Sequence, residues 1–386
     1  MKLYFYLVVF CLNFCVYAGD QVPIASGSIF TVFIDDNNEI NFSGTSYHEN
    51  NSIIKEINSL PLKNIKKIYS CSCFIVFLGD DGRVFVCGDK KIFNDSLVSN
   101  KICASNEINF SATITSVSVG NSHALFLDEN GEVFVCGSNK YLQLGLNDFF
   151  ETNALIKLDY LSGISDICAG HLNSFFVDFN GVVYSCGFNS HGQLGANKFS
   201  YNKSACPIEN LTNIKKISAG VYHTIFLDAS GKVFTCGWNN HKQLGLKNCL
   251  ETSRPIEIDA IPDIRFVFAA YCGSFFIDVN ADVWACGDSS YGQLGLGNNK
   301  SKNEIAKIRH TSDIEFIFAA PYHSIFVDSN GDIFGCGDNI NFQLGRDYSK
   351  TSIPQIIFPN KKCLKPVQNS GENNMKNARS CFIQRQ

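Results

Sequence analysis

Short apolar runs alternate with polar turns along most of this chain, and the pattern recurs with a fixed period. Five segments join two apolar runs through a polar turn, at 122–137, 173–187, 222–237, 273–287 and 322–337. An Asp opens every turn, and Asn-Gly or Ser-Gly follows in four of the five; these residues are Asp128, Asp178, Asp228, Asp278 and Asp328. An Asp followed by a glycine able to adopt positive φ is typical of a tight β-hairpin. Each segment therefore predicts one hairpin.

Two further strands flank each predicted hairpin. An apolar segment ending in small residues precedes it, as at 214–220, 264–270 and 314–320. A loop ending in Gln-Leu-Gly follows it, at 143–145, 193–195, 243–245, 293–295 and 343–345, and often leads into a Pro-containing strand such as 254–258. A lone four-stranded sheet cannot bury its faces, so such units must stack, and closure into a ring protects their edges. The pattern therefore predicts a propeller.

The dipeptide Cys-Gly marks the period. It recurs with spacings of 49 once and 50 four times, and its cysteines are Cys87, Cys136, Cys186, Cys236, Cys286 and Cys336. A weaker copy, FSG, ends at Gly44, which gives seven units. The combined pattern of small residue, His, Asp-x-x-Gly, Cys-Gly and Gln-Leu-Gly resembles the regulator of chromosome condensation repeat family over about residues 22–360, with the first two units degenerate. The resemblance implies an all-β, seven-bladed β-propeller of four-stranded repeats about fifty residues long.

The two ends of the repeat region are expected to share one blade. Residues 352–358 occupy the place of a fourth strand, while 22–44 hold a hairpin without a first strand. We therefore expect the ring to close by pairing of N- and C-terminal strands. The expected organisation is a signal peptide at 1–18, the propeller at 19–360, and a polar, basic, disordered tail at 361–386.

The N-terminus has the pattern of a secretory leader. One Lys precedes fifteen uncharged, mostly apolar residues, Leu3 to Tyr17, and small residues stand at the expected cleavage position. The run is too short for a comfortable membrane span. A first β-strand would use similar residues, but the predicted fold begins near Gln21 and leaves the run without a place. We expect a protein of the secretory pathway or extracellular space, with the cytoplasm or nucleus as the alternative.

Seven N-glycosylation sequons give weak support to secretion. One is at Asn41. The other six lie mostly in predicted loops, where a glycan could be accommodated, and are possible acceptors: Asn50, Asn94, Asn109, Asn202, Asn210 and Asn299.

Composition fits a large globular protein. With 45% hydrophobic and 18% charged residues, the chain can bury a sizeable core, and its 33 Phe favour strands. The net charge of −4 includes a basic tail, and the body without tail and leader carries about −10. Binding to phosphate backbones depends on Lys and Arg, so an acidic body argues against a nucleic-acid partner.

The cysteines do not suggest a disulfide scaffold. The chain has 17, or about 4% of its residues. The six Cys-Gly cysteines fall in different blades, and we expect buried thiols that act as small hydrophobes. Some loop or tail cysteines could pair in a secreted protein, with a connectivity that spacing does not give: Cys71, Cys73, Cys103, Cys206, Cys249, Cys363 and Cys381. Cys71-x-Cys73 has no second pair at metal-ligand spacing, so zinc is not expected.

No pattern of an enzyme is present. His123, His223 and His323 share one repeat position, where we expect each to bond a neighbouring turn or strand. A second repeated position, four residues after each glycine, is also interpreted as framework: His48, Tyr141, His191, His241 and Tyr291. A nucleophile motif, a phosphate-binding glycine loop and paired carboxylates are all missing from the sequence. We predict no catalytic residues, no cofactor and no metal.

Two aromatic residues depart from the repeat. Phe188 and Trp238 directly follow Cys-Gly in successive units, where the others carry Thr, Ser or Asp. Exposed aromatics suit a protein-binding hot spot, although they could equally cover the neighbouring blade's loop. We predict a monomeric, non-enzymatic protein-binding scaffold that enters the secretory pathway, with an unidentified protein partner. The resemblance implies an alternative, an intracellular guanine-nucleotide exchange factor for a Ran-like small GTPase; an enzyme with a pocket at the propeller axis is the weakest hypothesis.

Overall fold

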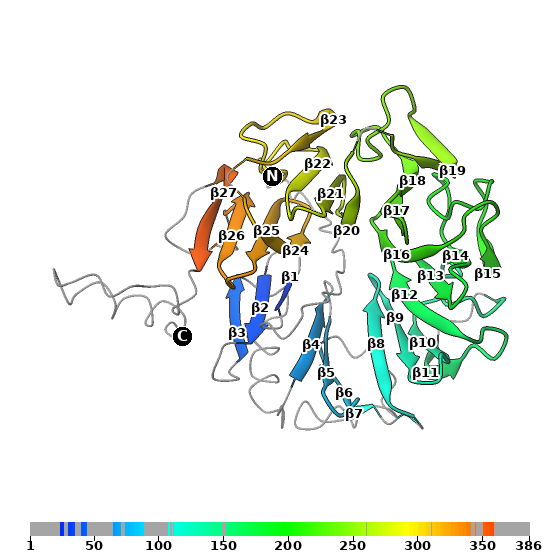
Figure 1. Ribbon diagram of the computed structural model, residues 1–386. Helices are drawn as coiled ribbons and strands as arrows, with labels where there is room; N and C mark the ends of the chain where they lie inside the picture. The colour runs from blue at the N-terminus through cyan, green and yellow to red at the C-terminus, as the bar shows by residue number, and fades with distance from the viewer. Residues whose placement is uncertain are drawn as a thin grey trace, which may run out of the picture.

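The computed structural model describes residues 24–26, 30–34, 40–44, 65–70, 74–88, 107–108, 110, 112–148, 152–259, 261–309, 311–340, 344 and 350–358 of the chain. Every regular element in these segments is a β-strand, which confirms the all-β prediction (Figure 1). The predicted signal peptide and the predicted tail lie outside the described residues.

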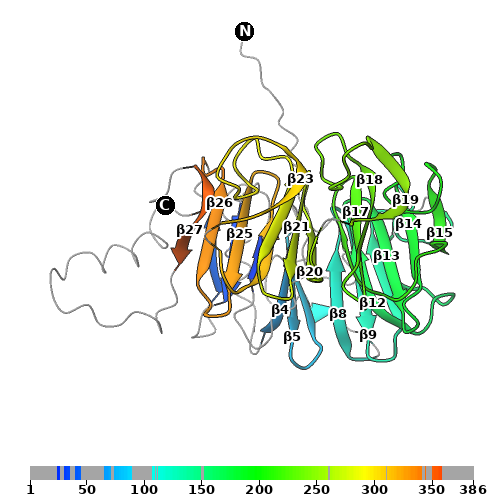
Figure 2. The same ribbon diagram turned by 45° about the horizontal axis from the view of Figure 1, so that its top comes forward.

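Six antiparallel four-stranded sheets stand in a ring and form a β-propeller (Figures 1 and 2). In each blade the strands follow one another in sequence order, and the first strand contacts the first strand of a neighbouring blade around the axis. The first three blades are β4 (Ile65–Ser70), β5 (Phe74–Gly79), β6 (Val84–Gly88) and β7 (Glu107–Ile108); β8 (Ile114–Val119), β9 (His123–Asp128), β10 (Val133–Gly137) and β11 (Thr152–Lys157); and β12 (Ile164–Ala169), β13 (Asn173–Asp178), β14 (Val183–Gly187) and β15 (Asn202–Pro207). The next three are β16 (Ile214–Ala219), β17 (His223–Asp228), β18 (Val233–Trp238) and β19 (Glu251–Glu257); β20 (Ile264–Ala269), β21 (Gly273–Asp278), β22 (Val283–Gly287) and β23 (Lys302–Lys307); and β24 (Ile314–Ala319), β25 (His323–Asp328), β26 (Ile333–Gly337) and β27 (Thr351–Phe358).

The predicted blade count and closure are wrong. The described part of the first repeat forms a three-stranded sheet of β1 (Ile24–Ser26), β2 (Phe30–Ile34) and β3 (Ile40–Gly44), so the described residues form six four-stranded blades rather than seven. This repeat lacks Gln-Leu-Gly, but the second repeat lacks it too and still supplies a fourth strand, β7, so the motif alone does not decide whether a fourth strand forms. Strand β27 pairs with β26, its own repeat's third strand, and no strand pair among the described residues joins it to β1–β3. Each four-stranded blade therefore takes all its strands from one repeat.

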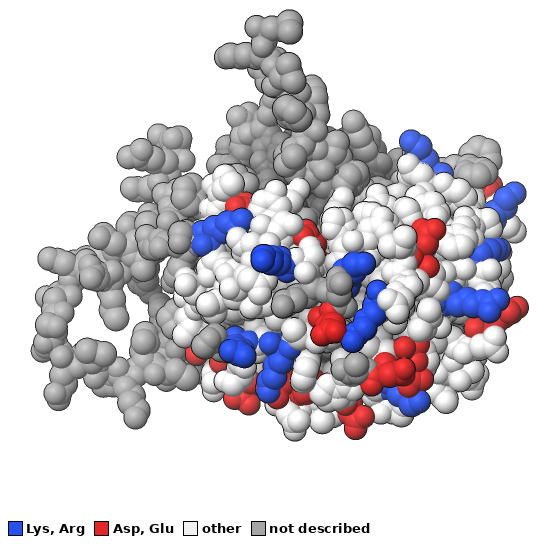
Figure 3. Space-filling model, turned by 90° about the horizontal axis from the view of Figure 1, so that it is seen from above, with Lys and Arg blue, Asp and Glu red and all other residues white. Residues whose placement is uncertain are grey.

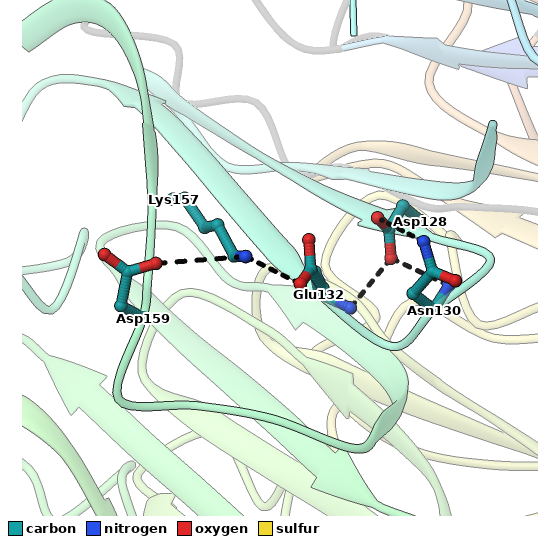
Figure 4. A network of polar contacts seen from close by, with 5 residues as sticks. All are labelled: Asp128, Asn130, Glu132, Lys157 and Asp159. Carbon is teal, nitrogen blue, oxygen red and sulfur yellow. Dashed lines mark hydrogen bonds and ion pairs between the residues drawn. The ribbon is translucent and has the colours of Figure 1, made fainter. Parts of the chain in front are cut away.

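The hairpin turns form as the Asp pattern predicts. In the turn after β9, one carboxylate oxygen of Asp128 accepts hydrogen bonds from the backbone N–H groups of Asn130 and Glu132, at 2.9 and 2.8 Å (Figure 4). Gly131 adopts φ 77°, a conformation that disfavours residues with a Cβ. Glu132 also pairs with Lys157 at 2.6 Å, on the fourth strand of the same blade. The first Asp of the repeat thus shapes the turn between the second and third strands.

Gln-Leu-Gly fixes the loop between the third and fourth strands. The side-chain oxygen of Gln243 accepts the N–H of His241 at 3.1 Å, Leu244 is fully buried, and Gly245 adopts φ 69°. The backbone carbonyl of Gln243 faces the next blade, where it accepts the hydroxyl of Ser274 at 2.6 Å. The motif therefore closes its own loop and bonds adjacent blades together.

The hydrophobic core lies between the blades. One cluster combines Leu125 and Leu127 of β9 with Ile164 and Ile167 of β12 in the next blade, and it includes Cys186 of β14. Such clusters repeat around the ring, because the alternating side chains of each strand face the two neighbouring sheets. Stacking between repeats supplies the burial that a lone sheet could not.

Candidate protein-binding face

Aromatic side chains form a contiguous cluster on one face of the propeller. We define the aromatic face as seven residues on three successive blades, six half-buried and Tyr201 exposed: Tyr141, Phe188, His191, Tyr201, Tyr222, Trp238 and His241. Six lie in the connections between first and second strands or between third and fourth strands, and Trp238 is the last residue of the third strand β18. In an up-and-down blade these connections share one edge of the ring, opposite the Asp-x-x-Gly turns (Figure 2).

The rings contact one another mostly edge to face. Phe188 lies 5.5 Å from Tyr141 and 5.6 Å from Tyr201, measured between ring centroids. Trp238 lies 5.6 Å from Tyr222 and 5.0 Å from His241. Such packing holds aromatic rings in defined orientations. The face therefore presents aromatic groups that are ordered before any partner arrives.

The two halves of the cluster are joined across blades. Tyr222 is 6.5 Å from Phe188, and it is 5.2 Å from His191 of the preceding blade. His191 in turn lies 5.7 Å from Trp238. Phe188 and Trp238, singled out in the sequence, thus contact the neighbouring blade and also belong to a larger surface.

The hairpin register brings Tyr222 and Trp238 together. His223 pairs with Gly237, which places the two aromatic residues opposite one another, and the N–H of Trp238 donates to the carbonyl of Tyr222 at 2.8 Å. The predicted hairpin at 222–237 contains Tyr222 and ends one residue before Trp238. Tyr222 does not stand out when equivalent positions of the repeats are compared, because its relation to Trp238 is that of facing positions within one hairpin.

Three more tyrosines continue the aromatic surface over the next two blades. Tyr291 and Tyr322 have ring centroids 4.9 Å apart, and the ammonium of Lys350 lies 4.8 Å from the Tyr291 ring. Tyr271 is also half-buried, and burial is the main cause that raises its pKa to about 12.

The charges near the aromatic face are of both signs. His191 Nδ1 lies 3.2 Å from a carboxylate oxygen of Glu251. Lys140 lies 5.8 Å from the ring of Tyr141. On the side of the molecule drawn in Figure 3, basic and acidic side chains are interspersed and neither sign forms a broad field.

The repeated histidines connect blades, as expected. Nε2 of His223 lies 3.0 Å from the hydroxyl of Ser274 in the next blade, and His123 bonds Ser174 in the same way at 2.9 Å. Each serine hydroxyl donates onward to a Gln backbone carbonyl, so the imidazole N–H is the donor to the serine. Burial lowers the pKa of His123 and His223 to about 3. Neutral imidazoles are therefore part of the framework.

The Cys-Gly cysteines with described side chains are buried thiols, as predicted: Cys136, Cys186, Cys236, Cys286 and Cys336. Burial raises the pKa of Cys286 to about 12 and raises the pKa of the other four. Cys206 and Cys249 carry free thiols, and the remaining cysteines considered for pairing lie outside the described residues. The six Cys-Gly positions thus contain no activated thiol among those described.

The sequons differ in accessibility. Asn210 and Asn299 are exposed. Asn202 is buried, and its side-chain amide donates to the carbonyl of Ser185 at 3.2 Å, so the native fold leaves no room for a glycan there. Asn50, Asn94 and Asn109 lie outside the described residues.

The described segments hold no group of three or more His, Cys, Asp or Glu side chains that could bind a metal ion. In the same residues, no helix is long and apolar enough to span a membrane.

The ring of blades with an aromatic face defines a β-propeller assembled from sequence repeats. Part of this repeat region matches models of the regulator of chromosome condensation (RCC1) repeat: one family model matches 114–143 and 214–243, and a second matches 180–227 and 230–277. The resemblance inferred from Cys-Gly and Gln-Leu-Gly is confirmed. None of the curated proteins compared with the chain matches it.

Several solved structures share the fold. Human WBSCR16 is 20% identical with a TM-score of 0.64, covering 74% of this chain and 79% of that one. Prp20p from Saccharomyces cerevisiae, described with its binding properties to Gsp1p and histones, is 18% identical with a TM-score of 0.63, covering 80% and 89%. The CRINKLY WD40 ectodomain of the Arabidopsis thaliana receptor kinase ACR4 is 13% identical with a TM-score of 0.51, covering 91% and 100%. Repeats and fold together support a protein-binding propeller scaffold.

Proposed function

We propose that this propeller is a non-enzymatic, monomeric scaffold of the secretory pathway or extracellular space, and that a protein partner docks on its aromatic face. One observation carries the proposal: seven contacting aromatic and imidazole rings cover one face of three adjacent blades. Tyr and Trp are enriched in binding hot spots, where they bury a large area at a small entropic cost. A monomeric propeller has no need of such a surface for its own core.

The arrangement of the rings also favours partner binding over the alternative that Phe188 and Trp238 only cover the loop of the neighbouring blade. Rings already held edge to face lose little freedom on binding, which lowers the entropic cost of association. Tyr201 and Tyr291 remain 44% and 38% exposed at the margins of the surface. A docking protein would cover these margins and the exposed edges of Phe188 and Trp238.

The test compares the effect on partner binding of substitutions on the aromatic face and on the opposite face of the propeller. The partner is first identified by photo-crosslinking to wild-type protein and purified, and its dissociation constant is then measured for Trp238→Ala, Phe188→Ala and Phe179→Ala. Phe179 is the matched control, because it is 73% exposed on a hairpin turn of the opposite face. We expect at least about tenfold weaker binding for the first two variants, as for hot-spot residues. Equal binding by all variants would dismiss the aromatic face.

The compartment is tested separately. The leader pattern at 1–18 and the exposed sequons at Asn210 and Asn299 support entry into the secretory pathway. N-terminal sequencing of the native protein should find a start at Gly19, in an endomembrane or medium fraction. An intact Met1 on a cytosolic or nuclear protein would refute this part of the proposal.

A second candidate function is guanine-nucleotide exchange on a Ran-like GTPase. The observation in its favour is the structural likeness to Prp20p, whose description names binding to Gsp1p. Release of a fluorescent guanine nucleotide from such a GTPase, measured with and without this protein, decides the matter. Accelerated release would support exchange, and an unchanged rate would leave the scaffold proposal.

A further inference from the structure

The two edges of the ring differ in charge. The edge with the aromatic face is made of the connections between first and second and between third and fourth strands. Among the described residues, three aspartates and six lysines lie in these connections, and the lysines are Lys140, Lys198, Lys242, Lys247, Lys300 and Lys350. The described connections of the opposite edge hold eleven carboxylates and three basic side chains. The acidic charge of the chain is therefore concentrated away from the aromatic face.

Most of these six lysines have no carboxylate partner. Lys247 forms an ion pair with Glu304 at 2.8 Å. The other five make no ion pair with any described residue, and all of them except Lys242 are exposed. Of the three aspartates only Asp148 is exposed, and Glu251 at the start of β19 adds one exposed carboxylate. Both signs thus occur near the rings, but uncompensated ammonium groups are in excess.

Two of the unpaired lysines lie at opposite ends of the aromatic surface. Lys140 is 5.8 Å from the ring of Tyr141, and Lys350 is 4.8 Å from the ring of Tyr291. Lys350 also donates to the carbonyl of Ser290 at 3.4 Å. Neither a ring nor a carbonyl removes the charge of an ammonium group. Rings flanked by charged groups match the apolar core and polar rim of a protein–protein interface.

Exposed apolar side chains stand close to the lysines in sequence. Phe199 directly follows Lys198 and is 50% exposed. Leu250 is 67% exposed and lies in the same connection as Lys247. A partner that matches this edge therefore needs apolar groups and negative charges together.

We propose that the aromatic face binds an acidic protein segment, whose Asp and Glu side chains lie at the lysines while its apolar side chains cover the rings. This inference rests on the proposed function and adds the chemistry of the partner. A cationic segment would meet unpaired ammonium groups, and like charges across an interface cost affinity. The carboxylates of the opposite edge would repel an acidic segment, which favours docking on the aromatic side.

A polypeptide fits this edge better than a nucleic acid does. Arg is the residue that binds phosphate in a bidentate manner, and the described connections of this edge contain no Arg. Proteins that bind single strands stack bases on the faces of aromatic rings. Here Tyr222 and Trp238 meet at an interplanar angle of 83°, so each ring packs against another ring. The geometry suits side-chain contacts more than base stacking.

The first experiment measures binding of three probes to the full-length protein by fluorescence anisotropy. The probes are a random copolymer of Glu and Tyr, a copolymer of Lys and Tyr, and duplex DNA. Wild-type protein should bind the Glu–Tyr copolymer and prefer it to the other two. The double variant Lys140→Glu with Lys350→Glu should bind it at least about tenfold more weakly, because it places like charges opposite one another.

Lys215→Glu with Arg309→Glu is the matched control. It makes the same change in net charge at exposed positions on or beside the opposite edge. At physiological ionic strength the Debye length is about 8 Å, so these positions are screened from a probe on the aromatic face, and binding should stay within about twofold of wild type. Preference for the Lys–Tyr copolymer or for DNA, or an equal loss in both double variants, would overturn the inference.

The second experiment separates this inference from the proposed function. The association rate constant and affinity of the crosslinked and purified natural partner are measured at low and high salt, for wild type, the lysine double variant and Trp238→Ala. An acidic partner should associate more slowly at high salt and with the lysine variant. If Trp238→Ala weakens binding while salt and the lysine variant have no effect, the docking face stands and its acidic partner is wrong. If none of the three changes binding, the proposed function fails as well.

Discussion

Mild acid should destabilise the propeller through its interblade histidines. His223 is fully buried, bonds Ser274 through Nε2, and packs against Gly220, where an added Cβ would come within 2.6 Å of the ring. Burial lowers its pKa from the ordinary 6.5 to about 3. A proton therefore binds the unfolded chain more readily than the native one.

The sign of the effect follows from this difference. Because the folded pKa is depressed, the contribution of the neutral imidazole to stability is complete above pH 6.5 and is lost as the pH falls toward 3. At pH 5 the loss is about 2 kcal/mol for one such histidine. His123, with a pKa of about 3, and His323, with about 4, add comparable amounts.

His223→Asn isolates this contribution. Asn is the residue at the equivalent position 173, so the change is one that the repeat accommodates. At pH 7.5 the variant should be less stable than wild type by about 1–3 kcal/mol, the cost of losing a buried hydrogen bond. At pH 5 this gap should shrink by about 2 kcal/mol, because the variant has no imidazole to protonate.

Urea unfolding of both proteins at pH 7.5 and pH 5 measures the two gaps. Comparison with wild type at each pH cancels the contribution of the carboxylates. Ser274→Ala is the control, since it removes the hydrogen bond and keeps His223, so its gap from wild type should stay nearly constant. A gap for His223→Asn that is equal at both pH values would refute the assignment of a buried, neutral His223.

Three further predictions concern local structure. Ala281 stands at φ 62° where other hairpins carry glycine, so Ala281→Gly should raise the free energy of unfolding by about 1 kcal/mol, and Gly231→Ala, at φ 91°, should lower it by a similar amount in the same assay. Leu244→Ala should lower the free energy of unfolding by about 3–5 kcal/mol, because the side chain is fully buried; a loss under 1 kcal/mol in urea unfolding would contradict that burial. A thiol reagent applied to the native protein should modify Cys249 before Cys236, as peptide mapping by mass spectrometry would report, and labelling of Cys236 at an equal rate would argue against its burial.

Local motifs predicted the blade well because each has a short-range physical cause. The Asp-x-x-Gly turn depends on one carboxylate and one positive φ, and Gln-Leu-Gly depends on a side chain that caps its own loop. These interactions span only a few residues, so the residues that make them recur together in the repeats and can be recognised in the sequence. The family resemblance followed from the same residues.

Long-range features could not be predicted in the same way. How the ring closes depends on whether the C-terminal strand pairs with an N-terminal strand. The sequences of 352–358 and 22–44 do not show which strand each one pairs with. The aromatic face combines Phe188 and Trp238, which share one repeat position, with Tyr222, which occupies another. The Asp166–Lys216 ion pair is harder still to predict, since it joins single residues from the first strands of two adjacent blades.

The agreement of blade and repeat boundaries has a consequence for how this fold can vary. In each described four-stranded blade, every hydrogen-bonded strand comes from a single stretch of about fifty residues. Duplication or loss of such a stretch would add or remove one complete sheet and leave the ladders of all others intact. A ring with a different number of blades would then require changes in the side-chain packing between sheets, while the hydrogen bonding within each sheet stayed the same. Growth of such a protein by whole modules requires only that each new module fit its two neighbours.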